Sequence, residues 1–327
     1  MLHVQIITST EHARVVLDLL QHDPTVVNVV HLPGAAHKPR GDVIVGDVTR
    51  ESADELIEHL TSMGIDTQGS ITVTPIDVML SSGARRAEAL APGRGSDALV
   101  WSEVETRVAY QSQMSFSFLT LMGIATLLGA LGAIYDNSVL VVGAMVAGPE
   151  YGALAAISVG LIRHKRWLRR RGAVSLVVGF GIAIVGTVVI LAVLNGLDII
   201  TITRLEAARP NTDFIYQPDS RSIVVAILAG IVGTISLTSA SSTTLVGVLI
   251  SVTTIPAAGN AAAAIVDGDL AQAQGSLLQL GINLAGIIIA GVITLTVQEH
   301  LWKRYGRPRL ARVRERDQER RDRISPT

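Results

Sequence analysis

The sequence predicts an α-helical polytopic membrane protein with a small α+β domain at its N-terminus. Hydrophobic residues make up 49% of the 327-residue chain and its mean hydropathy is +0.44, which is too apolar for an ordinary soluble protein. Apolar runs of about twenty residues, enough to cross ~30 Å of hydrocarbon, are confined to 114–298. Two of these runs are interrupted at their centres by a proline.

Residues 1–77 alternate short β-branched strands with amphipathic helices. The expected strands are 3–8, 26–32, 42–46 and 71–75, the expected helices are 11–22 and 51–63, and a Pro/Gly-rich loop is expected at 33–41. The order βαββαβ is that of the ferredoxin-like split unit. Such domains pair with one another or hold a small effector, so we expect a cytoplasmic oligomerisation or regulatory module.

The rest of the chain divides into a linker with a lead-in amphipathic helix (78–113), a six-helix transmembrane domain (114–298) and a charged tail (299–327). The six expected spans are 114–134, 139–161, 173–194, 222–241, 245–266 and 276–297. The loop after the second span and the tail are both densely basic. Because basic residues mark the cytoplasmic side of short loops, we expect both termini on the inner side of the cytoplasmic membrane.

Spans two and five contain the interruptions. Pro149 and Pro256 are each followed three residues later by a glycine, Gly152 and Gly259. Aligning the prolines gives an offset of 107 residues (256 − 149 = 107), which predicts an internal repeat of three spans. An odd number of spans inverts the second copy, so the sequence predicts a 3+3 inverted repeat whose two broken helices meet near the midplane. The alternative is that each proline only kinks a packed helix.

Glu150 is the acidic residue placed deepest in an expected span. An ionisable group there costs at least ~2.5 kcal/mol, so it is a functional hypothesis, a proton carrier or cation ligand. The alternative is a protonated side chain that bonds carbonyls freed by Pro149. Polar residues near the second break complete the candidate site. The expected solute- or ion-binding residues are Pro149, Glu150, Gly152, Thr253, Thr254, Pro256, Gly259, Asn260 and Asn283.

The expected external segment around 199–213 mixes opposite charges. Arg204, Glu206, Arg209 and Asp213 could form an outer gate, although a solvated short helix is the simpler interpretation. The charged tail alternates basic with acidic residues, which fits a solvated helix better than a nucleic-acid-binding arm.

Enzyme signatures are missing from the sequence. It has no phosphate-binding loop, no His-Glu-x-x-His and no Gly-x-Ser-x-Gly. It has no cysteine, and His31 and His37 lack a cluster of further ligands, so we expect no metal site. A net charge of −1 excludes nothing by itself. We therefore expect no enzyme and no cofactor; the expected partners are the lipid bilayer, a small solute or ion, and further copies of the chain.

The segment from Asn137 to Pro149, with its Gly-Ala-Met element, resembles a family of bacterial and archaeal hydrophobic membrane proteins, the domain of unknown function 389 type. Residues 201–210 and 247–259, with Asn283 downstream, carry the same resemblance, which covers about 100–297. It implies a multi-span inner-membrane protein and no defined activity. The family pattern has an apolar residue where this chain has Glu150, and a second proline where it has Ala257.

Together these patterns predict a transport protein that binds a small polar or charged solute between two broken helices, with proton coupling through Glu150. A passive channel gated by the cytoplasmic domain is the alternative within transport. A membrane-anchored sensor or scaffold that moves nothing is the alternative from another class.

Overall fold

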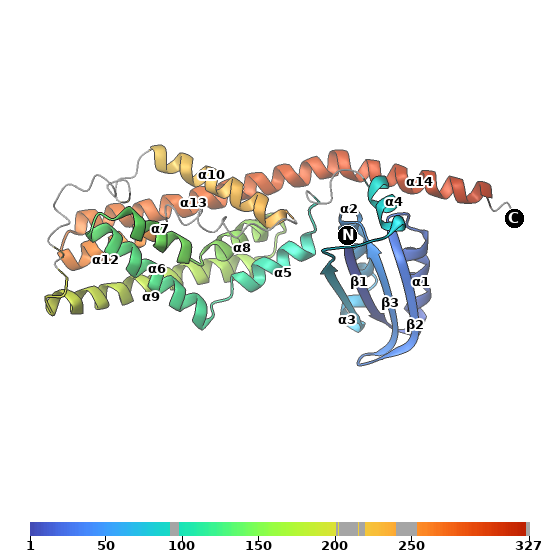
Figure 1. Ribbon diagram of the computed structural model, residues 1–327, viewed down its shortest axis with the longest axis horizontal. Coiled ribbons are helices and arrows are strands. Elements are labelled where there is room, and N and C mark those ends of the chain that lie inside the picture. Colours follow the sequence, from blue (N-terminus) through green and yellow to red (C-terminus); the bar gives the residue numbers. More distant parts are fainter. Residues whose placement is uncertain (92–97, 201, 203–214, 216–219, 240–253, 325–327) are drawn as a thin grey trace. The chain divides into compact units, whose positions relative to one another are not determined.

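The computed structural model describes residues 1–91, 98–200, 202, 215, 220–239 and 254–324. The chain divides into two compact units (Figure 1). The first comprises 1–104, 238–241 and 297–327, and the second comprises 105–237 and 242–296. The first unit holds a β-sheet with its helices, and the second is helical throughout its described residues.

The first unit contains an antiparallel sheet of four strands in the order β2-β3-β1-β4. With one helix after β1 and another after β3, the order is βαββαβ, and the predicted ferredoxin-like domain is confirmed. The elements are β1 (Leu2–Thr8), α1 (Thr10–His22), β2 (Val26–His37), β3 (Arg40–Val48), α2 (Arg50–Ser62), α3 (Ile65–Gln68), β4 (Ser70–Pro75) and α4 (Ser82–Leu90).

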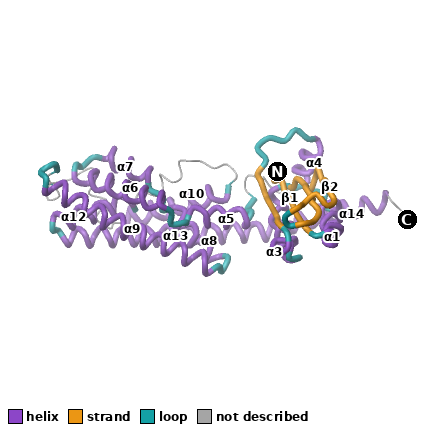
Figure 2. Tube along the Cα trace, turned by 90° about the horizontal axis from the view of Figure 1, so that it is seen from below, coloured by secondary structure: helices purple, strands orange, loops and turns teal. Residues whose placement is uncertain are grey.

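Hydrophobic side chains from one face of the sheet form the core of this unit. Every second residue of β1, beginning with Leu2, is buried, as expected for a strand with one covered face. Leu2 and Ile6 share a cluster with Leu20 of α1 and Leu56 of α2. The side chain of Ser9 caps α1 by accepting the backbone N–H of His12. The purple helices and orange strands of this layer can be followed in Figure 2.

The predicted loop at 33–41 is wrong, because β2 and β3 extend into a longer hairpin. The pairing is irregular between Leu32 and Ala36, where Pro33 has no N–H to contribute to a ladder. Gly34 adopts φ of +65°, and its N–H donates to Asp42 at 3.0 Å. That bond, with a second from His31, lowers the pKa of Asp42.

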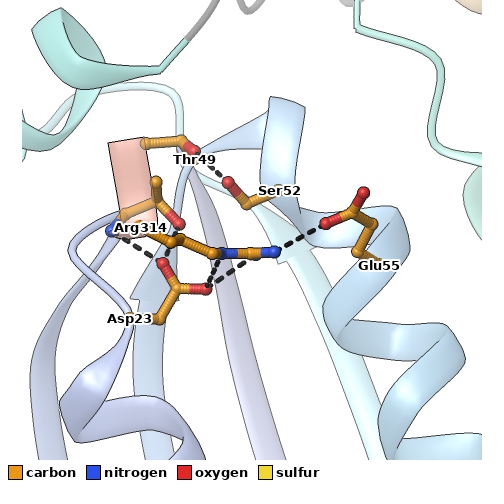
Figure 3. Close-up of polar contacts among 6 residues, drawn as sticks. Asp23, Thr49, Ser52, Glu55 and Arg314 are labelled. Carbon is orange, nitrogen blue, oxygen red and sulfur yellow. Dashed lines mark hydrogen bonds and ion pairs between the residues drawn. The ribbon is translucent and has the colours of Figure 1, made fainter. Parts of the chain in front are cut away.

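The first unit also includes the end of the chain. Helix α13 (Leu270–Leu301) is followed by a π-helical turn (Trp302–Gly306) and by α14 (Arg307–Ile324). The guanidinium of Arg314 donates to Asp23 after α1 and to Glu55 in α2, at 2.8 and 2.7 Å (Figure 3). Burial alone would lower the pKa of Arg314, but the two carboxylates outweigh burial and raise it. This ion pair fixes α14 against the N-terminal domain.

The second unit consists of apolar helices. Three helices are long and apolar enough to cross a membrane, and there are four if the bent pair α7 and α8 counts as one span; this counts only described residues. The helices are α5 (Trp101–Gln111, which begins in the first unit), α6 (Phe116–Ile134), α7 (Ser138–Ala147), α8 (Tyr151–Ile162), α9 (Arg166–Gly196), α10 (Ser220–Thr238), α12 (Ile255–Asp267) and α13. The predicted spans one, three and six lie in α6, α9 and α13. Span four corresponds to α10, whose segment Ser222–Thr238 counts among the shorter apolar helices, and much of span five lies outside the described residues.

Large apolar side chains remain exposed along the long helices. Val177 and Val185 of α9 are 74% and 64% exposed, and Ile289 and Ile293 of α13 are similar. Soluble monomers rarely expose contiguous apolar surface of this extent. The exposed belts and the helix lengths together indicate a membrane protein.

The helices of the second unit recur at a constant spacing. α10 begins 104 residues after α6 (220 − 116 = 104), and α12 and α13 begin 104 residues after α8 and α9 (255 − 151 = 104; 270 − 166 = 104). This spacing differs by three residues from the 107 given by aligning the prolines. The reason is that Pro149 precedes the first residue of α8, whereas Pro256 lies inside the first turn of α12.

Candidate functional site

The break between α7 and α8 positions the first part of the site. The side chain of Asn137 caps α7 by accepting the N–H groups of Val139 and Leu140. α7 ends at Gly148, and α8 starts after Glu150 at an angle of 52°. Because Pro149 has no N–H, the helix cannot continue its hydrogen bonding through this position. The predicted interruption of this span is confirmed.

Glu150 meets the second broken segment directly. The hydroxyl of Thr254 donates to Oε1 of Glu150 at 2.6 Å, and both residues are fully buried. Glu150 is the N-cap residue of α8, and Thr254 is the N-cap residue of α12. The backbone carbonyl of each accepts the first bonds of its own helix. The site therefore places a carboxylate and a hydroxyl between two helix N-termini, where the helix dipoles favour negative charge.

The two glycines expected to line the site instead make close helix contacts. A Cβ atom at Gly152 would lie 2.4 Å from Cβ of Gln111 at the end of α5. One at Gly259 would lie 2.4 Å from the backbone nitrogen of Ala130 in α6. Both positions allow the half-helices to approach their neighbours, which is how they contribute to the site.

Asn260 belongs to a buried polar group on α12 and α13. Its Nδ2 donates to Oγ of Ser276 at 2.8 Å, and its Oδ1 accepts from Nε2 of Gln272 at 3.3 Å. Ser276 donates in turn to the carbonyl of Gln272. Asn260 and Ser276 are fully buried. The group can supply donors and acceptors at fixed positions.

Two further amides continue this group along α13. Gln279 and Asn283 are 2% and 0% exposed. The Oε1 atom of Gln279 is buried without a hydrogen-bond partner. Sequence reasoning found Asn283 but missed Gln272, Ser276 and Gln279. Their spacing of four, three and four residues places all of them on one face of a helix, which is the signal that could have found them.

The other expected site residues lie at the break, in the first turn of α12 or outside the described residues. Pro256 is buried in the first turn of α12, where its fixed φ is compatible with a helix start. Pro149 is half-buried at the break. Thr253 and the expected gate residues Arg204, Glu206, Arg209 and Asp213 lie outside the described residues. Among the residues that are described, no group of three His, Asp or Glu could hold a metal ion.

The expected cytoplasmic end of the helical unit is held by ion pairs. Glu105 of α5 accepts from Arg163 at 3.1 Å and also from Lys165, both in the turn before α9. Arg107 donates to the carbonyl of Leu237 in α10. The lead-in helix is thereby tied to the ends of three helices of the second unit.

The first unit contains a separate cavity of about 740 Å³ between α1, α2 and α14. Four carboxylates, two histidines and Arg314 line it. Its charged lining residues are Asp18, His22, Asp23, Glu55, Glu58, His59 and Arg314. The cavity is large enough for a small effector.

Residues 145–289, which include the break between α7 and α8, the whole of α12 and the polar face of α13, match the family model described as a domain of unknown function (DUF389). The chain carries a DUF389 domain. The match begins in α7 and ends in α13, so it covers most of the second unit. No curated protein and no solved structure matches the chain.

Proposed function

We propose that the DUF389 domain and its flanking helices form a membrane transport unit. Six spans, arranged as a 3+3 inverted repeat, would carry a small polar or charged solute past Glu150, whose carboxyl group couples the movement to protons. The observation that carries the proposal is the buried bond between Glu150 and Thr254, because it joins the N-caps of the two interrupted segments.

Reciprocal contacts support the repeat. A Cβ atom at Gly129 of α6 would lie 3.2 Å from the carbonyl oxygen of Ile255 in α12. Adding 104 to 129 and subtracting 104 from 255 gives Gly233 and Tyr151, and the Tyr151 hydroxyl donates to the carbonyl of Gly233. Position 129 of the first half thus contacts 255 of the second, and their equivalents 233 and 151 also contact each other. Such reciprocal contacts are what a two-fold relation between the halves produces.

Glu150 and Thr254 are themselves 104 residues apart. Under a two-fold relation, a residue touches its own equivalent only at the axis. The pair therefore marks the axis of the proposed repeat. Because each half has three spans, this axis lies in the membrane plane, and the pair lies near the midplane.

Charge distribution supports the orientation. Arg163 and Lys165, at the turn before α9, and the basic tail would face the cytoplasm, whereas the turn between α12 and α13 contains Asp267 and Asp269 and no basic residue. Both termini and the ferredoxin-like domain are then cytoplasmic, in the cytoplasmic membrane. That domain would assemble copies of the chain or regulate them.

Flux through proteoliposomes tests the proposal. Purified full-length protein is reconstituted with an internal pH dye, and gradients of Na⁺, K⁺ and Cl⁻ are imposed in turn. We expect at least one gradient to drive a protein-dependent pH change, and we expect Glu150→Gln to abolish that change. Thr296→Ala, an exposed position on α13, is the control and retains the change. Equal pH-dependent flux in Glu150→Gln would overturn the coupling, and no flux in any gradient would overturn transport of these ions.

A sensor function is the second candidate, favoured by the acidic cavity of the first unit. That function predicts binding at the cavity between α1, α2 and α14, outside the second unit, and no flux. A channel gated by the same domain predicts single-channel currents in planar bilayers, which a carrier does not give.

A further inference from the structure

The polar face of α13 extends further than the Glu150–Thr254 pair requires. Gln272, Ser276, Gln279 and Asn283 are each at most 9% exposed. On the opposite face of the same helix, Leu278 and Ile289 are 57% and 59% exposed. The helix thus buries amides and a hydroxyl while it exposes leucine and isoleucine, the reverse of a soluble helix.

The length of this face matches half a membrane. Eleven residues separate Gln272 from Asn283, and at 1.5 Å per residue they span ~16 Å, about half of the hydrocarbon thickness. Thr254 lies thirteen residues before the end of α12, and Asn283 lies thirteen residues after the start of α13. Because a short turn joins the two helices, Asn283 lies at a depth comparable with that of the Glu150–Thr254 pair.

The chemistry of the face selects by charge. The buried polar residues described in the helical unit are amides, hydroxyls and the single carboxylate of Glu150, and no lysine, arginine or histidine is buried among them. When Glu150 is ionised it supplies negative charge at the helix N-termini, so an anionic solute would then meet a like charge. The carbonyl oxygens of Gln279 and Asn283 are ligands that suit a dehydrated cation.

The free Oε1 of Gln279 points to a ligand or water. Buried polar atoms in folded proteins nearly always have a partner, and one without a protein partner usually bonds solvent. Hydrogen bonds between membrane helices contribute little to stability. Helix association therefore gains little from burying the five polar side chains of Asn260, Gln272, Ser276, Gln279 and Asn283.

We propose that Gln272, Ser276, Gln279 and Asn283, with Asn260, line a half-channel from the α12–α13 turn to Glu150, closed at these buried residues in the structure and hydrated when it opens, and that it admits small cations and excludes anions. The inference rests on the proposed transport function. It adds the class of solute and the side from which the solute enters, the outer side in the proposed orientation.

Cysteine labelling tests this inference, because the natural chain has no cysteine to remove. Full-length variants Ser276→Cys, Gln279→Cys and Leu278→Cys are reacted with cationic and anionic methanethiosulfonate reagents, and rates are normalised to a free thiol. We expect the two cysteines of the polar face to react at least ten-fold faster than the Leu278 variant. We expect the normalised cationic rate to exceed the anionic rate, and reaction only from the side of the α12–α13 turn.

Ser175→Cys, on the equivalent position of α9, is a second control and is expected to react slowly. Rates at 276 and 279 no faster than at 278 would overturn the half-channel, and equal normalised rates for the two reagents would overturn cation selectivity. Ser276→Cys replaces one small polar side chain by another, so the test does not depend on the Gln279 variant folding. Labelling without flux would support the half-channel and overturn the transport function. Flux that depends on Glu150, without labelling, would support the transport function and overturn the half-channel.

Discussion

The described helices of the two parts of the helical unit, α6, α8 and α9 in the first and α10, α12 and α13 in the second, begin 104 residues apart but differ in chemistry. In the first half Ala156 packs against Gly172, where a Cβ atom would lie 3.3 Å from Cβ of Ala156. At the equivalent place in the second half, Asn260 bonds Ser276 at 2.8 Å. An apolar contact between two helices has become a polar one at the same place in the fold.

The same exchange occurs at two of three further positions, while the third is polar in both halves. Residues 104 before Gln272, Gln279 and Asn283 are Leu168, Ser175 and Gly179. At the proposed axis the exchange is reversed, because the first half supplies Glu150 and the second supplies Thr254. The similar helix spacing of the two halves is compatible with both chemistries. This difference in chemistry is the reason for placing the proposed half-channel along α12 and α13 rather than along α8 and α9.

The largest effect is expected where a half-helix packs most tightly. Gly259→Val would place its side chain against the backbone of Gly129 and Ala130 in α6, which cannot move aside, and we expect a loss of about 3 kcal/mol in unfolding free energy. Gly143→Val is the matched control, since no atom lies within 4 Å of a Cβ atom there. Unfolding in mixed detergent measures both variants. Equal stability of the two would mean that α12 does not pack on α6 as described.

The second effect concerns the axis. Thr254→Val removes the hydroxyl that donates to Glu150 and leaves a buried carboxyl group with one donor fewer, at a cost of about 2 kcal/mol. If the halves are equivalent there, the double variant Glu150→Thr with Thr254→Glu restores the bond with its partners exchanged. We expect the double variant to be more stable than Thr254→Glu alone, by thermal unfolding of the detergent-solubilised protein. A double variant that is less stable than either single variant would argue against the two-fold relation.

The sequence predicted the elements of both units better than it predicted their contacts. The alternation in β1 and the proline at 149 act over a few neighbouring residues, so the βαββαβ order and the broken span could be inferred from local patterns. The hairpin at 33–41 was missed because Pro and Gly suit a bulged ladder as well as a loop. The bond from Thr254 to Glu150 joins residues 104 apart, and no local pattern records such a contact.

The helix starts and the prolines give different offsets for the proposed repeat. Matching Pro149 with Pro256 gave 107, but the two prolines end one segment and begin another, which are different roles three residues apart. The amides of α13 were visible as a spacing and were overlooked, since each residue alone is unremarkable in a helix. The spacing of polar residues along one face of α13 would have been more informative than the two prolines.

A smaller effect is expected when the second half is made to resemble the first. The double variant Asn260→Ala with Ser276→Gly recreates the pair found at 156 and 172. The variant removes two interhelical bonds, each worth about 0.6 kcal/mol, so we expect a loss of at most about 2 kcal/mol once the cost of glycine in a helix is included. The same variant should lose most of the flux that depends on Glu150. A large loss of stability instead would identify the polar group as structural, as chemical unfolding would reveal.

The smallest effect is expected at Pro256. This proline occupies the first turn of α12, where an unpaired N–H is normal, so Pro256→Ala should cost less than about 1 kcal/mol, mainly through the freer unfolded chain. Pro149→Ala is its comparison, because an N–H at 149 can bond a carbonyl of α7 and extend that helix into the break. We expect Pro149→Ala to fold with near-normal stability but to reduce Glu150-dependent flux, whereas Pro256→Ala keeps it. Thermal unfolding and flux measured side by side distinguish the two, and equal flux in both would mean that the bend at Gly148 and Pro149 is maintained by the surrounding helices rather than by the proline.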